Sequence, residues 1–176
     1  MNETPEASRQ LVDQVISRMV RAGQLQRISR GLFSRPTVHR KLGPLPPASE
    51  DIAASLERII GMPVIPSGAL ALNVLRLSQQ VPAKLEFKTA GPTRTIQVGK
   101  RQILLKHAPA SRFRARARIV PLVVEALSAL GRQRVTADTV KTIRSVLGDR
   151  DRTALRKHIG DAPVWMQPHL RQIVAE

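Results

Sequence analysis

The stretch Arg9–Pro36, RQLVDQVISRMVRAGQLQRISRGLFSRP, carries the pattern that decides the fold of the N-terminal part of the chain. Apolar residues recur in its first half at helical spacing, which predicts a helix with one buried face. Gly23 supplies the left-handed residue that ends such a helix. Two short strands are expected next, Leu25–Ile28 and Leu32–Ser34, around a basic turn at 29–31. The apolar stripe consists of Leu11, Val12, Val15, Ile16, Met19 and Val20.

A helix followed by a tight basic hairpin is the second half of a winged helix-turn-helix, whose helix enters the major groove of DNA. Glutamine can pair with adenine and arginine with guanine, whereas arginines on the hairpin suit phosphates. The alternative is an ordinary amphipathic helix with a solvated polar face. The candidate DNA-binding residues are Arg9, Gln10, Gln14, Ser17 and Arg21 on the helix, and Arg27, Arg30 and Arg35 on the hairpin.

The net charge of the 176-residue chain is +16, which favours an anionic partner, most often nucleic acid. Residues 1–41 hold eight basic and three acidic residues, a net of +5, whereas residues 84–118 hold ten and one, a net of +9. A protein that binds DNA only through its N-terminal part would not need the second block. The sequence therefore predicts a second anionic partner for the larger part of the chain.

The most unusual pattern in that second block is RFRARARI, residues 112–119. On a strand, strict alternation would place the arginines on one side and the apolar groups on the other. A stripe of this kind could bind phosphates, each contact releasing a counterion. A solubilising stretch that leads into a helix at Pro121 explains the pattern equally well. The candidate second basic patch consists of Arg112, Arg114, Arg116 and Arg118.

The fold class expected from the whole pattern is α+β, in two parts. Residues 1–41 form the helix-and-hairpin unit, residues 42–48 a stiff proline-rich linker, and residues 49–176 a mixed domain. Within that domain, residues 84–88, 93–98 and 101–107 are expected to form an antiparallel meander, and helices are expected over 49–60, 68–77, 121–130, 137–147, 153–159 and 168–175.

Several function classes are disfavoured. There is no cysteine, no apolar run of about 20 residues and no signal-peptide pattern, so we expect a cytoplasmic protein without a membrane partner. The four histidines show no metal-ligand spacing, and no phosphate-binding or nucleophile motif occurs. Ser67, before a helix at Gly68, is best explained as its cap, and Trp165 as a core or docking residue. We therefore expect no catalytic residue, metal or cofactor, and no enzyme.

The chain resembles the AbiEi-type antitoxins of bacterial type IV toxin–antitoxin (abortive infection) systems. The first part of the resemblance is Arg9–Pro36, which is similar to their N-terminal winged-helix domain. Two helices precede the recognition helix in that module, whereas here it begins near residue 5. Three explanations are open: the sequence begins late, the two helices are lost, or a partner chain supplies them. The remaining similarity lies in 66–69, Asn73, Leu77, 80–83, 89–92, Arg94, Ile96, 105–107 and 162–166.

This resemblance implies an antitoxin and transcriptional autorepressor. Its N-terminal part would bind the double-stranded operator DNA of its own operon, and its larger AbiEi-like domain would neutralise a nucleotidyltransferase-like toxin. Whether antitoxicity needs direct contact with the toxin is left open. The alternative is a stand-alone regulator that binds DNA or RNA and has no toxin partner, using the 84–118 block.

Overall fold

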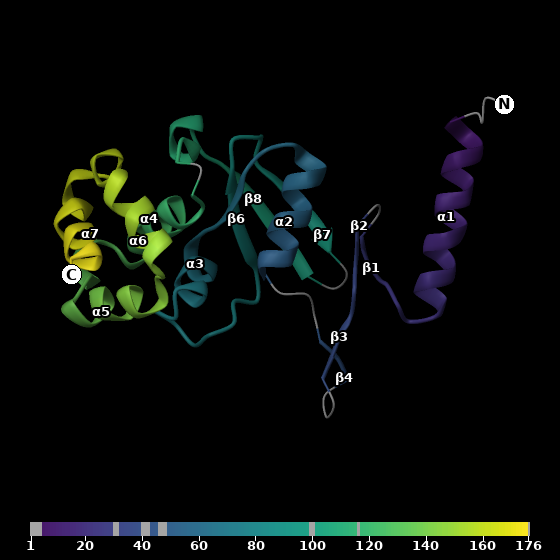
Figure 1. Cartoon of the computed structure of the whole chain (residues 1–176), viewed down its shortest axis with the longest axis horizontal. Helices are drawn as coiled ribbons and strands as arrows, with labels where there is room; N and C mark the ends of the chain where they lie inside the picture. The colour runs from purple at the N-terminus through teal and green to yellow at the C-terminus, as the bar shows by residue number, and fades with distance from the viewer. Residues whose placement is uncertain are drawn as a thin grey trace.

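The computed structural model describes residues 5–29, 32–39, 43–45, 49–98, 101–115 and 117–175. Over these residues the chain is an α+β protein with seven α-helices and a four-stranded mixed sheet. Figure 1 shows the sheet and the C-terminal helices side by side, with the first helix standing apart from both. No helix in the described part combines the length and apolar character needed to cross a membrane.

The N-terminal elements follow the expected order of helix, turn and hairpin. α1 spans Pro5–Arg21, and β1 (Gln26–Ser29) pairs antiparallel with β2 (Leu32–Ser34). Gly23 has a φ of +70°, and the amides of Gln24 and Leu25 both donate to the carbonyl of Met19, at 2.9 and 3.2 Å. These bonds satisfy carbonyl oxygens at the end of the helix and turn the chain toward the hairpin.

The prediction that the apolar stripe of α1 is buried is wrong for the chain taken by itself. Leu11, Val12 and Val15 are 58%, 52% and 50% exposed, and Ile16, Met19 and Val20 are half-buried. The spacing of the stripe predicts the helix correctly. Burial, however, needs a second surface, and Figure 1 shows no described element lying along this face.

A second hairpin was not expected. β3 (Thr37–His39) pairs antiparallel with β4 (Gly43–Leu45), which lies inside the segment 42–48 that the sequence predicted to be a linker. Pro44 stands opposite Val38 in this pair. A two-stranded ribbon tolerates a proline because each strand has a free edge that needs no amide donor.

The main sheet has the order β5-β6-β8-β7. Its strands are β5 (Val64–Pro66), β6 (Leu85–Thr89), β7 (Arg94–Val98) and β8 (Arg101–His107). β8 runs parallel to β6 and antiparallel to β7, while β5 runs antiparallel to β6. The predicted antiparallel meander is therefore wrong, although its three strands are correctly located.

Burial explains this topology. The register places Leu85 opposite Ile103 and Phe87 opposite Leu105, and all four side chains are at most 2% exposed. β7 exposes most of its side chains, so it suits the edge of the sheet. An interior position for β8 buries more apolar surface than the sequential arrangement would.

The sheet packs against α2 (Ser49–Ile60) and α3 (Gly68–Val74), and this packing forms the first of two hydrophobic clusters. The second cluster is helical and involves α4 (Ile119–Leu130), α5 (Ala137–Val146), α6 (Asp149–Lys157) and α7 (Gln167–Val174). Short 3-10 turns connect these elements: η1 (Ala110–Phe113), η2 (Arg132–Arg134), η3 (Ile159–Asp161) and η4 (Val164–Met166). α3 belongs to both clusters, because Leu70 lies in the first and Ala71 in the second.

The C-terminal helices agree with the sequence prediction to within a few residues. Thr136 caps α5 as a capping box: its Oγ1 accepts from the amide of Thr139 at 3.3 Å, and Thr139 Oγ1 accepts from the amide of Thr136 at 3.2 Å. α4 is apolar on nearly all sides, as a helix enclosed by others must be. Trp165 packs partly buried against the helical cluster.

The exposure of α1 can be tested by two leucine truncations. Leu11→Ala should change the free energy of unfolding by less than about 0.5 kcal/mol, because the side chain contacts mainly solvent. Leu127→Ala, at a residue with no exposed surface, should cost about 2–5 kcal/mol. Urea denaturation at two protein concentrations measures both. A large, concentration-dependent cost for Leu11→Ala would instead mean that a second molecule covers the stripe.

Candidate functional site

The polar face of α1 is fully available to a partner. The helix residues proposed for base contacts, Arg9, Gln10, Gln14, Ser17 and Arg21, are all exposed. Asp13, Gln14, Ser17, Arg18 and Arg21 together line a shallow groove of about 410 Å³ along the helix. Donors and acceptors on two adjoining turns therefore face the same side, which is the arrangement that base edges in a major groove require.

Exposed arginines also lie on and directly after the β1–β2 hairpin that follows α1. Arg27 and Arg35 are exposed, and the Arg27 guanidinium lies 5.9 Å from the centroid of the Phe33 ring on the opposite strand. This cation–π contact holds the guanidinium on one face of the ribbon. Arg30, the third predicted hairpin contact, lies outside the described residues. The structure thus brings the described part of the predicted N-terminal set onto one connected helix-and-hairpin unit.

The second predicted basic patch does not form the stripe that its alternation suggested. Residues 110–113 are a 3-10 turn and α4 begins at Ile119, so the segment is not a strand. Arg112 Nη1 lies 3.6 Å from Glu125 Oε1, and Arg118 pairs with Glu57. Arg114 is exposed, and Arg116 lies outside the described residues. Two of the four arginines therefore have partners inside the protein instead of facing solvent as a set.

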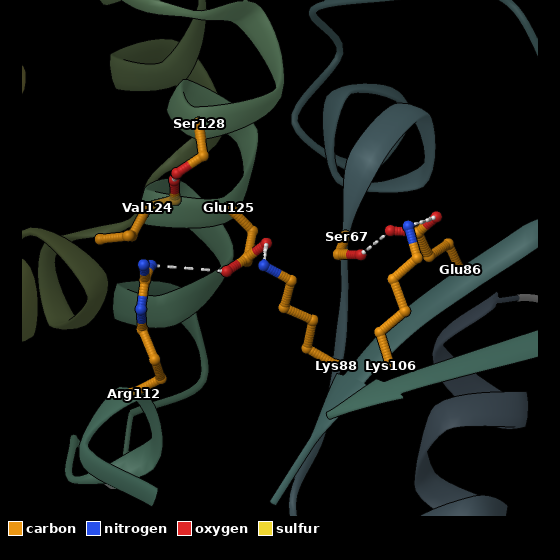
Figure 2. Close-up of polar contacts among 8 residues, drawn as sticks. All are labelled: Ser67, Glu86, Lys88, Lys106, Arg112, Val124, Glu125 and Ser128. Carbon is orange, nitrogen blue, oxygen red and sulfur yellow. Dashed lines mark hydrogen bonds and ion pairs between the residues drawn. The ribbon is translucent and has the colours of Figure 1, made fainter. Parts of the chain in front are cut away.

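Glu125 is the most buried of these partners. It lies on α4 with 7% of its side chain exposed, and its Oε2 atom is 3.1 Å from Nζ of Lys88 on β6. Figure 2 shows Lys88 and Arg112 approaching this carboxylate from two sides. A carboxylate removed from water must be paired, so both cations are held in place. No local pattern signals this contact, because its members are 13 to 37 positions apart in the chain.

Glu57 plays a similar part at the start of α4. Its Oε1 atom accepts from the amide of Val64 at 2.8 Å, and its Oε2 atom pairs with Arg118. One side chain on α2 thereby joins the start of β5 and the residue that precedes α4. Arg118 is consequently a structural residue in this arrangement, although its side chain is 60% exposed.

Ser67 was expected to cap α3, but its hydroxyl makes no capping bond. It donates instead to Oε1 of Glu86 at 2.9 Å, while Lys106 Nζ lies 2.8 Å from Oε2 of the same carboxylate (Figure 2). Burial raises the pKa of Glu86, but the hydrogen bonds from Lys106 and Ser67 and the charges of Lys106 and Lys88 outweigh it, so the net pKa is lowered. Ser67 has no exposed surface and cannot reach an external substrate.

The histidines are not gathered into a site. His107 Nδ1 lies 3.1 Å from the carbonyl oxygen of Gly91, and His158 Nδ1 lies 2.8 Å from Oδ2 of Asp161. Within the described ranges, no group of three or more histidine or carboxylate residues could hold a metal ion.

Residues 5–155 match the model of a family described as "Family of unknown function (DUF6088)". The chain belongs to this family. The match includes α1, the hairpins and the sheet, and it ends within α6. No curated protein and no solved structure matches the chain.

The lowered pKa of Glu86 predicts a pH-dependent contribution to stability. A carboxyl group whose pKa is lower in the folded state stabilises the fold above its ordinary pKa of 4.5 and loses that effect as the pH falls through the folded value. Glu86→Gln should therefore reduce the free energy of unfolding by about 1 kcal/mol or less at neutral pH, since the pair is partly solvated. The difference from the unchanged protein should shrink as the pH falls below 4.5 and vanish only below the lowered pKa of the folded state.

Denaturant titrations from pH 3 to pH 8 measure this difference. Asp138→Asn is the control, because its pair with Lys141 is long at 3.9 Å and both side chains are at least 80% exposed. A constant difference between Glu86→Gln and the unchanged protein at every pH would contradict the assignment.

Proposed function

We propose that this DUF6088 protein is a bacterial antitoxin of the AbiEi type, which represses its own operon and neutralises a nucleotidyltransferase-like toxin. The observation that carries the DNA-binding part is the unit formed by α1, the turn at Gly23 and the β1–β2 hairpin. Its exposed polar face and exposed arginines have the layout of a recognition helix with its wing. The resemblance of the sequence to the antitoxins supports the remainder.

The proposed division of labour assigns base contacts to the helix and phosphate contacts to the hairpin. Arg9, Gln10 and Gln14 would read bases, because glutamine and arginine can form bidentate pairs with purine edges. Arg27 and Arg35 would neutralise phosphates at the flank, which adds affinity without adding sequence preference. The operator would lie upstream of the protein's own gene.

The larger part of the chain, from α2 onward, would carry the antitoxin activity. Among the described residues, the members of both hydrophobic clusters fall between Ile52 and Val174, so this part has a core of its own. A domain with its own core can act on a toxin independently of DNA binding. The protein would act without chemistry of its own, as a binding partner or regulator and not as an enzyme.

Two substitutions distinguish base contacts from phosphate contacts. Gln14→Ala should weaken binding to the upstream duplex by about 1–3 kcal/mol and leave binding to random duplex unchanged. Arg35→Ala should weaken both alike and lower the slope of log affinity against log salt by about one. Fluorescence anisotropy over a salt series measures both. Arg150→Ala, on the distant helix α6, is the control; equal losses on both duplexes for Gln14→Ala would argue against a recognition helix.

Removal of residues 1–48 tests the antitoxin activity separately. The shortened chain should no longer repress a reporter driven by the upstream region, because it lacks α1 and the hairpin. It should still restore growth to cells that express the neighbouring nucleotidyltransferase-like gene. If the shortened chain is soluble and folded but gives no protection, the assignment of antitoxin activity to the larger part is refuted. If no such gene adjoins this one, a stand-alone regulator becomes the better explanation.

A further inference from the structure

A cleft of about 420 Å³ opens beside the first turns of α4, away from the DNA-binding unit. One wall is formed by η1 and the residues that follow it, and the other by η3, η4 and the residues between them. The volume of the cleft is in the range of small-molecule sites. The apolar lining consists of Ala115, Val120, Pro121, Val124, Ala162, Pro163 and Val164.

The polar groups of the cleft stand on its two walls. Arg112 lies in η1 and Arg114 directly follows it, whereas His158 and Asp161 come from the opposite wall. The acidic groups already have partners: Glu125 is 3.1 Å from Lys88, and Asp161 is 2.8 Å from His158. The carboxylate of Glu125 is therefore paired with a lysine ammonium, and that of Asp161 is hydrogen-bonded to a ring nitrogen of His158.

The arginines remain available. Arg112 is 41% exposed, and its only ion pair in the described structure is the 3.6 Å approach to Glu125, which leaves most of its five N–H donors unused. Arg114 is exposed and forms no ion pair with any described residue. Two guanidinium groups on one wall, above an apolar floor, form a cationic site with an adjoining apolar surface.

We propose that this cleft binds a nucleoside monophosphate, with the phosphate on Arg112 and Arg114 and the base against the aliphatic floor. Guanidinium forks match the geometry of phosphate oxygens, and they retain their charge at every physiological pH. Proline and valine side chains offer a flat apolar contact to one base. The site takes one nucleotide unit, because the described walls enclose no further apolar surface and carry no aromatic ring. This inference does not depend on the antitoxin function.

The same nucleotide unit could be a free metabolite or the end of a single-stranded nucleic acid. The shared chemistry is one phosphate and one base. A short single-stranded oligonucleotide of the preferred base separates the two sources from each other. Tighter binding of the oligonucleotide than of the mononucleotide assigns the cleft to nucleic-acid ends, and equal or weaker binding assigns it to the free nucleotide.

Calorimetric titration of the full chain with AMP, GMP, CMP and UMP tests the proposal. At least one of them should bind tenfold more tightly than its nucleoside or inorganic phosphate, because both halves of the site are then filled. Arg114→Gln should weaken that binding at least tenfold. Val164→Asp adds a negative charge at the cleft. It should weaken the binding similarly without affecting the fold, because Val164 is 81% exposed.

Two further readouts locate the binding. Trp165 is the sole tryptophan and directly follows the cleft residue Val164, so its fluorescence should change on titration. Arg150→Gln, an exposed arginine on α6, is the matched control and should alter the affinity less than twofold. Absence of binding by all four nucleotides overturns the proposal. Equal weakening by Arg150→Gln and Arg114→Gln also overturns it, because the attraction would then be that of a chain with a net charge of +16.

Discussion

The carboxylate of Glu125 is the contact on which the arrangement of this protein depends. It lies within α4, an otherwise apolar helix, and it joins the helical cluster to the sheet through Lys88. Leaving that carboxylate buried without a cation would be strongly unfavourable, so α4 can pack only where Lys88 and Arg112 reach it. Hydrophobic contacts are non-directional, whereas this ion pair accepts one rotation of α4 about its axis. The pair thereby adds a directional contact to the apolar packing through which α3 already joins the two hydrophobic clusters.

A carboxylate that joins separate elements also occurs at two other places in the fold. Glu57 connects α2 with β5 and with the start of α4, and Glu86 connects β6 with β8 and with the start of α3. In each case one carboxylate receives donors from two elements. These three carboxylates are therefore paired with residues distant in sequence. The helices and strands that the pairs join also contribute residues to the hydrophobic clusters.

These pairs reduce the positive charge that residues 84–118 can offer to a partner. Among its ten basic residues, Lys88, Lys106, Arg112 and Arg118 have carboxylate partners within the protein. Glu57 and Glu125 lie outside the block in sequence but beside it in space. The local net charge of +9 consequently overstates what a partner would meet. The described basic side chains of the block that are exposed and have no carboxylate partner are Lys84, Arg94 and Arg114, and Arg114 lies at the cleft together with the exposed part of Arg112.

The sequence by itself determined the local structure. The positions of α1, its end at Gly23, the first hairpin, β6 to β8 and the capped helix α5 follow from periodicity, turn residues and capping, which act over a few neighbouring positions. Only the tertiary structure decided that β8 lies between β6 and β7, that Ser67 bonds to Glu86 instead of capping α3, and that Arg112 and Arg118 turn toward carboxylates. It also left the stripe of α1 exposed. These outcomes depend on which surfaces of remote segments come into contact. Burial and charge pairing between such segments produce no periodic pattern in the sequence, so they could not be predicted from it.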